Sequence, residues 1–114
     1  MTDPKTDTPH ALTLELRRGA LVLAVLSQLR TPQYGYSLRQ ALAERGLAIE
    51  EGTLYPLLRR LDAQGVLESD WRLEGGPPRR YYRLNESGLA LLRSLTETWS
   101  ELTTTMDRLL TEAP

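Results

Sequence analysis

The chain has 114 residues, of which 14 are lysine or arginine and 15 are acidic, so its net charge at pH 7 is −1. It has no cysteine, which excludes disulfides, thiolate metal sites and cysteine nucleophiles. No apolar run is long enough to span a bilayer, and the first ten residues lack a secretory signal pattern, so one small cytoplasmic domain is expected.

The first predicted element is a long helix over residues 12–29, preceded by a polar segment, residues 1–10, that is expected to be a disordered tail. From Ala20 to Leu26 this helix is apolar nearly all round. A helix without a polar face is buried on more than one side. In so short a chain, a second chain is a candidate to cover one of those sides.

A second helix is predicted over residues 36–45. It follows the helix breakers Pro32 and Gly35, and Gly46 stands where a C-terminal cap is expected. Its buried stripe is predicted to be Leu38, Ala41 and Leu42.

The third predicted helix has Thr53 as its N-cap and ends at Gly65. Pro56 is expected in its first turn, where the N–H groups are free in any case. The core-facing stripe follows the i, i+3, i+4, i+7 rule and consists of Leu54, Leu57, Leu58 and Leu61.

Two alternating segments, residues 66–73 and 79–84, come next and are separated by the turn sequence EGGPP. Alternation of this kind around a glycine- and proline-rich turn predicts a β-hairpin. Asn85 then caps a last helix, predicted over residues 86–110. Its apolar residues recur at steps of three and four, a 3.5-residue period that suits a partner helix.

The order of three helices, a hairpin and a helix predicts a mainly α fold with a β-hairpin (α+β), the winged helix-turn-helix. We expect residues 11–84 to form the DNA-binding part and residues 85–112 to form an added C-terminal dimerisation helix.

With the leucine stripe of the third helix turned inward, helical geometry points Gly52, Pro56, Arg59 and Ala63 away from the core. The major groove of DNA admits such a helix, and arginine pairs bidentately with guanine there. The second helix would cross the DNA backbone, and the hairpin tip would reach flanking phosphates or the minor groove. The candidate DNA-binding residues are Tyr36, Ser37, Arg39, Gly52, Thr53, Tyr55, Pro56, Arg59, Arg79 and Arg80.

These residues also have plainer interpretations. Arg59 and Arg60 suit a solvated helix surface, with Asp62 or Glu51 as ion-pair partners. Tyr55 can cover the core, and arginines on an edge strand guard against aggregation. The combination, in this order along the chain, favours DNA binding, with a winged helix that binds proteins as the alternative.

Catalysis is not expected. His10 is the only histidine, and the sequence shows no carboxylate pair, nucleophile elbow or phosphate-binding glycine loop. No cofactor and no metal site are predicted.

The sequence resembles the PadR family of transcriptional regulators. The residues that carry the resemblance are YGYSLRQAL at 34–42, GTLYPLLRRLDAQGVL at 52–67, Trp71 and RRYYRLNESGLALL at 79–92. Asn85 departs from the family, in which threonine is common at this place. The single C-terminal helix resembles the short branch of the family.

The resemblance implies a homodimeric repressor on a pseudo-palindromic operator, with the last helix packed on the first helix of the partner subunit. Some relatives bind flat aromatic compounds between the subunits, beside a tryptophan in the last helix, and Trp99 matches that place as a candidate effector-binding residue. The expected dimer interface consists of Leu16, Leu23, Leu92, Leu95, Trp99, Leu102, Met106 and Leu109.

Overall fold

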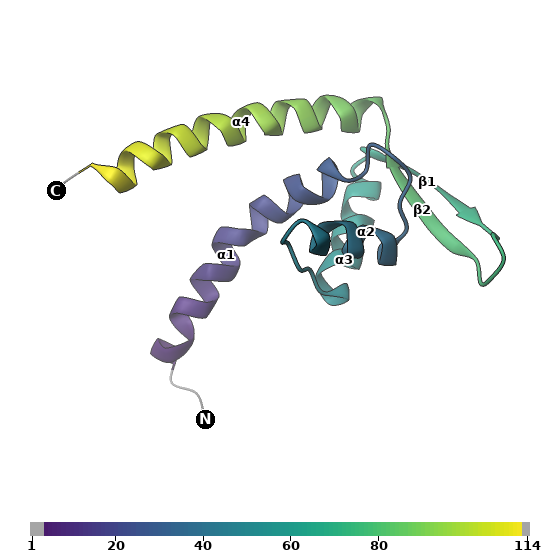
Figure 1. The fold of residues 1–114 in the computed structure, drawn as a ribbon, viewed down its shortest axis with the longest axis horizontal. Helices are drawn as coiled ribbons and strands as arrows, with labels where there is room; N and C mark the ends of the chain where they lie inside the picture. The colour runs from purple at the N-terminus through teal and green to yellow at the C-terminus, as the bar shows by residue number, and fades with distance from the viewer. Residues whose placement is uncertain (1–3, 113–114) are drawn as a thin grey trace.

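The computed structural model describes residues 4–112 of the chain, and the side chains of residues 8–112. Within this range the elements follow in the order α1 (Pro4–Ser27), α2 (Gly35–Glu44), α3 (Glu51–Ala63), β1 (Leu67–Arg72), β2 (Arg79–Leu84) and α4 (Glu86–Thr111). The helices α2 and α3 lie close together below the point where α1 and α4 approach each other, and the hairpin projects to one side as a wing (Figure 1). The predicted winged helix-turn-helix, mainly α with a β-hairpin, is confirmed.

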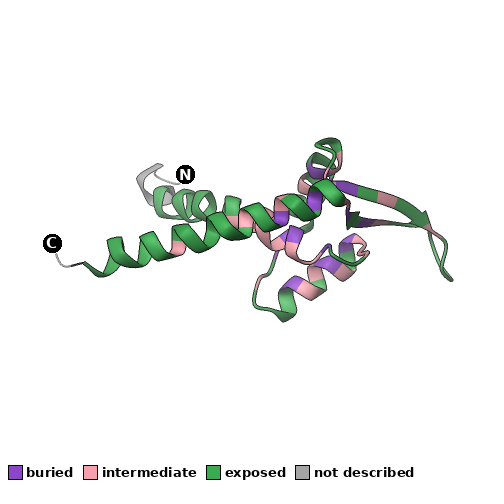
Figure 2. Ribbon diagram, turned by 90° about the horizontal axis from the view of Figure 1, so that it is seen from above, coloured by how far each residue is buried: buried purple, intermediate pink, exposed green. Residues whose placement is uncertain are grey.

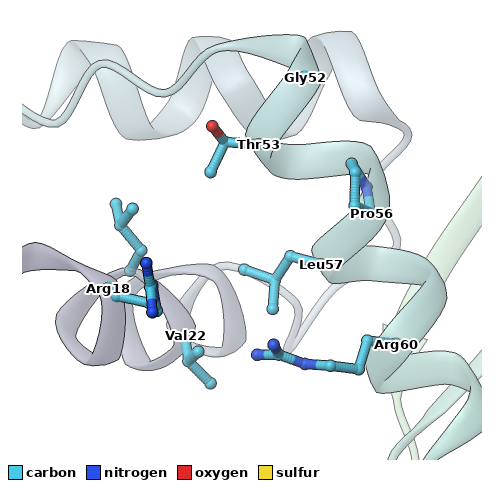
Figure 3. Close-up of a pocket in the computed structure, with 8 residues that line it drawn as sticks. Arg18, Val22, Gly52, Thr53, Pro56, Leu57 and Arg60 are labelled. Atoms are coloured by element: carbon cyan, nitrogen blue, oxygen red, sulfur yellow. The ribbon is translucent and has the colours of Figure 1, made fainter. Parts of the chain in front are cut away.

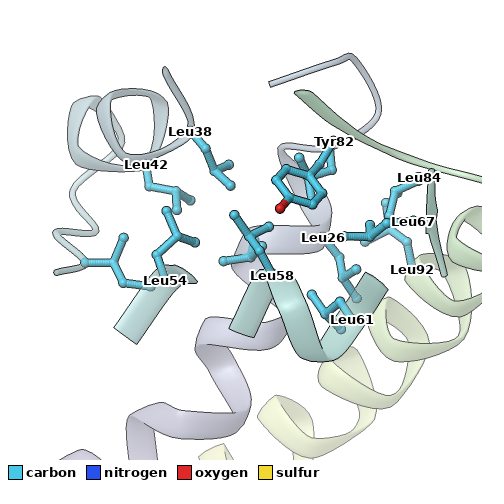
Figure 4. Close-up of a cluster of buried hydrophobic side chains, with 13 residues drawn as sticks. Leu26, Leu38, Leu42, Leu54, Leu58, Leu61, Leu67, Tyr82, Leu84 and Leu92 are labelled. Carbon is cyan, nitrogen blue, oxygen red and sulfur yellow. The ribbon is translucent and has the colours of Figure 1, made fainter. Parts of the chain in front are cut away.

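The core is a cluster of mainly leucine side chains to which every element contributes (Figure 4). Leu54, Leu58 and Leu61 of α3 are buried as the stripe predicts, whereas Leu57 is only half-buried because it borders a groove toward α1. Tyr82 is buried with them and belongs to the core. This cluster fixes which face of α3 is left for solvent.

The wing is an antiparallel pair whose register runs from Leu67 opposite Leu84 to Arg72 opposite Arg79. On its other edge, β2 is joined by two residues of the connection between α1 and α2, and the Leu29 carbonyl accepts the Leu84 N–H at 2.8 Å. Gln33 donates its N–H to the Tyr82 carbonyl at 2.9 Å and accepts the Tyr82 N–H at 2.8 Å. The wing is thereby anchored to the start of α2.

The start of α4 is fixed tightly against the base of the wing. The Asn85 side chain accepts the Gly88 N–H at 2.8 Å, which confirms it as the N-cap, and donates to the Gly65 carbonyl at 2.8 Å. A Cβ at Gly88 would lie 2.1 Å from the Val66 carbonyl oxygen, so this position requires glycine. Leu92, predicted on the dimer seam, is instead buried in the chain's own core, because the first turns of α4 pack there.

The two long helices extend beyond this core as arms (Figures 1 and 2). The radius of gyration is 17.0 Å, whereas a compact domain of this length is expected near 13 Å. Leu16 on α1 is 82% exposed and Leu102 on α4 is 50% exposed. Both arms therefore carry apolar side chains that the described part of the chain does not cover.

The predicted start of α1 was wrong. The helix begins at Pro4, so residues 4–10 are helical and not a disordered tail, while residues 1–3 lie outside the described range. Proline is compatible with the first turn of a helix, and α1 continues through Pro9. At its other end α1 stops at Ser27, two residues before the predicted end.

The predicted start of α3 was also wrong. Its N-cap is Glu50, which has extended backbone angles, and not Thr53. Pro56 is consequently the sixth helical residue and lies beyond the first turn. Because proline has no N–H, the Gly52 carbonyl receives no helical hydrogen bond from it.

Candidate nucleic-acid interface

The outer face of α3 is open to solvent. Gly52, Pro56, Arg59 and Ala63 are all exposed, as predicted from the leucine stripe. A recognition helix needs a face of this kind, free of the chain's own body, before it can enter a groove of DNA.

Arg59 has no hydrogen bond or ion pair with any residue that the structure describes. The two carboxylates that suited it as partners are used elsewhere, because Glu51 pairs with Arg39 and Asp62 pairs with Arg80. The interpretation of Arg59 as one half of a surface ion pair is therefore wrong. Its guanidinium keeps all its donors available for a ligand.

Tyr55 lies beside Arg59 and is held in place by a glycine of α2. A Cβ at Gly35 would lie 2.3 Å from the Tyr55 hydroxyl oxygen and 2.6 Å from the ring, so only glycine fits beneath this ring. The ring is 38% exposed, and its hydroxyl has no hydrogen-bond partner among residues 4–112. The sequence suggested Gly35 only as a helix breaker, since no local pattern reveals which side chain lies against a glycine.

Two predicted DNA contacts of α2 have structural partners. The Ser37 hydroxyl accepts the Tyr34 N–H at 3.1 Å and donates to Gln33 Oε1 at 2.7 Å, which stabilises the first turn of the helix. Arg39 donates from Nε to the Ile49 carbonyl at 3.0 Å. These contacts make Ser37 and Arg39 part of the helix-turn-helix framework.

The pair between Arg39 and Glu51, 3.1 Å from Nη1 to Oε1, joins α2 to the first residue of α3. It places a positive charge beside a carboxylate that would otherwise repel a phosphate at this end of α3. Tyr36, the remaining candidate on α2, is exposed. Its contact with DNA stays a prediction.

On the wing, the two predicted phosphate contacts differ in their surroundings. Arg80 donates from Nη2 to Asp62 Oδ2 at 2.9 Å and to Ser69 Oγ at 2.9 Å, so it links the wing to α3. Arg79 lies with its guanidinium 4.6 Å from the centre of the Tyr34 ring. Arg79 is thus supported by an aromatic face and keeps its donors exposed.

Arg79 is one member of a row of aromatic and arginine side chains that the sequence analysis missed. The Tyr34 and Tyr81 ring centres are 5.2 Å apart, and the Arg72 guanidinium lies 4.3 Å from the Tyr81 centre. The Tyr36 ring stacks on Tyr34 at 6.3 Å. Tyr81 belongs to β2, whereas Tyr34 precedes α2, and no local pattern in the sequence relates two residues so far apart.

Two of the depressions that border α3 lie beside its exposed face. One, of about 440 Å³, separates it from α1, and in Figure 3 Arg18 and Leu57 point into it while Arg60 extends from α3 toward α1. The other, of about 420 Å³, lies between α3 and the wing and is called the wing cleft below. It is lined by Tyr34, Gly35, Tyr55, Arg59, Trp71, Pro78, Arg79, Arg80 and Tyr82.

Among the described residues, no group of three or more histidine, cysteine or acidic side chains is placed to hold a metal ion. None of the helices in the described range is both long enough and apolar enough to cross a membrane.

The fold and this exposed helix, with the unpaired Arg59 on its outer face, define a winged-helix regulator of transcription, and comparisons with known proteins give its family. The model of the transcriptional regulator PadR-like family matches residues 22–94. A transcriptional regulator of Mycobacterium tuberculosis is 39% identical over 79 residues, which cover 68% of this chain and 74% of that protein.

Solved structures of similar fold point to the same family as the sequence matches. A PadR family transcriptional regulator from Eggerthella lenta superposes with a TM-score of 0.84 at 48% identity, covering 96% of this chain and 97% of that one. A PadR-like regulator from Bacillus cereus gives a TM-score of 0.77 at 29% identity, covering 87% and 99%. The chain belongs to the PadR-like family of transcriptional regulators. The predictions of a DNA-binding regulator and of a protein that is not an enzyme are thereby confirmed.

Proposed function

We propose that this regulator is a homodimeric repressor that inserts one copy of α3 into each half of a pseudo-palindromic operator. The observation that carries the proposal is the solvent-open face of α3 with the unpaired Arg59 at its centre. Arginine in such a place reads guanine through two parallel hydrogen bonds. A twofold pair of chains would place the two helices about 34–36 Å apart, on successive turns of the duplex.

Exposed apolar side chains on the two arms, α1 and α4, support the proposal of a dimer. Trp99, Leu102, Met106 and Leu109 form an exposed apolar seam along α4, and Leu16 is exposed on α1. Hydrophobic surface of this extent is typical of an interface. We infer that α4 of each subunit covers α1 of the other, with residues 11–84 binding DNA and residues 85–112 holding the pair together.

The charges of the two arms support the same pairing. Arg17 and Arg18 are exposed on α1, whereas Glu97 and Glu101 are exposed on α4 beside the seam. Opposite charges at the rim of an interface orient the partners and speed their encounter. Leu23 and Leu95, the other predicted interface residues, are half-buried within the single chain and would be covered further by a partner.

We further propose that a flat aromatic compound binds beside Trp99 and relieves repression. An apolar hollow of about 280 Å³ opens there, lined by Ala20, Leu23, Ala24, Ser27, Leu47 and Trp99. A ligand wedged at the dimer seam would rotate the subunits as rigid bodies and change the distance between the two copies of α3.

A gel shift on the duplex upstream of the protein's own gene, at a stated salt concentration, tests operator binding. We expect a discrete complex with this duplex at concentrations that leave a shuffled duplex of equal length unbound. Equal affinity for both duplexes would reject the operator, and no affinity for either would favour a winged helix that binds proteins.

Tryptophan fluorescence tests the effector site. In a Trp71→Phe protein, in which Trp99 is the only tryptophan, aromatic compounds that release the operator are expected to quench the emission. A Trp99→Phe protein should then keep its DNA binding and lose the release. Unaltered release from Trp99→Phe would exclude this residue as the binding platform.

A further inference from the structure

The wing cleft contains a large aromatic side chain that the fold does not use. Trp71 lies on the same face of β1 as the buried Leu67, yet it is 65% exposed. Its neighbour across the wing is Arg80, whose guanidinium is turned toward Asp62 and Ser69. An indole left in water at this position contributes little to the core and is available to a ligand.

The edge of β2 adds one backbone donor at Arg80, a residue that lines the same cleft. Both backbone groups of Tyr82 bond to Gln33, so they point away from β1. In an antiparallel strand the direction of these groups repeats every second residue, which points the N–H and C=O of Arg80 toward the same edge. No described residue pairs with that edge at Arg80, and Pro78, two residues before, has no N–H to offer.

We propose that the wing cleft holds the sugar–phosphate backbone of one operator strand. Trp71 would pack against a deoxyribose, while the Arg80 N–H and the Arg79 guanidinium would donate to a phosphate. The proposal rests on the DNA binding proposed above and names further residues that achieve it. It also changes the role of Arg80, which contributes its main chain to the contact while its side chain fixes the wing to α3.

Charge and position favour DNA as the occupant. Three arginines line the cleft, Arg59, Arg79 and Arg80, and none of its lining residues is acidic. Tyr55 and Arg59 belong both to the cleft and to the exposed side of α3, so a duplex on α3 would run directly into it. The wing lies at the opposite end of the molecule from the free ends of α1 and α4 (Figure 1), so a partner subunit on the arms leaves the cleft open.

The first test compares two alanine variants on the wing. Trp71→Ala is expected to weaken binding to the upstream duplex about tenfold, because removing some 50 Å² of buried apolar contact costs roughly 1.3 kcal/mol. Leu73→Ala is the matched control, since Leu73 is 74% exposed and does not line the cleft. Fluorescence anisotropy of a labelled duplex measures both affinities, and equal affinities for the two variants would overturn the proposal.

The second test leaves Trp71 intact and so does not depend on how its substitution affects folding. In a Trp99→Phe protein, Trp71 is the only tryptophan, and saturating duplex is expected to quench or shift its emission. Inorganic phosphate at the same phosphate concentration should leave the emission unchanged.

The outcomes separate this inference from the broader function. If the wild-type protein binds no duplex in the anisotropy assay, the proposed function fails and the inference fails with it. If duplex binds while Trp71 emission stays constant, only the inference is wrong. An equal response to inorganic phosphate would identify a site for small anions and would also overturn it.

Discussion

The leucines of the helix-turn-helix and those of the two arms have the same helical spacing but opposite surroundings. Leu54, Leu58 and Leu61 of α3 are buried by the chain itself, while Leu102 and Leu109 of α4 are exposed. Figure 2 shows the same contrast, with buried residues gathered near the helix-turn-helix and exposed ones along the outer part of α4. Periodicity therefore identifies an apolar face, and only the structure tells whether this chain or another covers it.

The largest effect is expected from a substitution on the α4 arm that disrupts dimerisation. Leu102→Asp places a carboxylate on the exposed seam, and each uncompensated buried charge costs about 3–5 kcal/mol. Because the proposed pair is symmetric, two such charges meet the interface, so the variant should sediment as a monomer.

The matched control on the same helix is Thr104→Asp, on an exposed position away from the seam. It should sediment like the wild type. A Leu102→Asp protein that remains dimeric would contradict the proposed interface.

In the core, Leu58→Ala should lower the free energy of unfolding by about 2–5 kcal/mol, because it leaves a cavity around a fully buried site. Leu16→Ala sharpens the comparison, since Leu16 is exposed in the single chain. Its effect should appear only through dimerisation and should therefore depend on protein concentration. Thermal melts at several concentrations measure both, and a concentration-independent loss for Leu16→Ala would show that α1 is covered within one chain.

Much of the fold could be predicted from the sequence because its signals are local. Alternation around EGGPP gave the wing, Asn85 gave the start of α4, and the leucine stripe gave the exposed face of α3. Helix starts were predicted less well. Thr53 has the side chain of an N-cap, but Glu50 holds that position, where the next residue, Glu51, pairs with Arg39 twelve residues earlier.

The candidate site was only partly predictable, because contacts between residues far apart in sequence leave no local signal. The sequence indicates which side chains lie outside, but not which of them have partners. Ser37, Arg39 and Arg80 are charged or polar residues in the expected places, and each is engaged within the chain. Arg59 has no such partner, a distinction that depends on contacts between residues far apart in sequence.

For base reading, Arg59→Ala should weaken operator binding by about 1–3 kcal/mol and relax the preference at one base pair of each half-site. Arg60→Ala is the matched control, because Arg60 is also exposed but lines the groove toward α1. Affinities for a set of singly substituted duplexes measure the preference. If Arg59→Ala weakens binding to every duplex of that set equally, Arg59 contacts a phosphate and not a base.

The smallest effect on DNA affinity is expected from substitutions of the wing arginines. Arg79→Ala should weaken all duplexes alike and reduce the slope of log affinity against log salt by about 0.9, as for one lost phosphate contact. Arg80→Ala should weaken binding too, with an added loss from freeing the wing, since it removes the link to Asp62. Titrations at several salt concentrations check both, and an unchanged slope for Arg79→Ala would exclude it as a phosphate contact.

A hydroxyl-radical footprint of the wild-type protein on its upstream duplex tests the central claim most directly. A twofold pair of chains, each presenting α3 to a major groove, should protect two dyad-related segments whose centres are about 10–10.5 base pairs apart or a multiple of this. A single protected segment, or two segments without dyad symmetry, would contradict it.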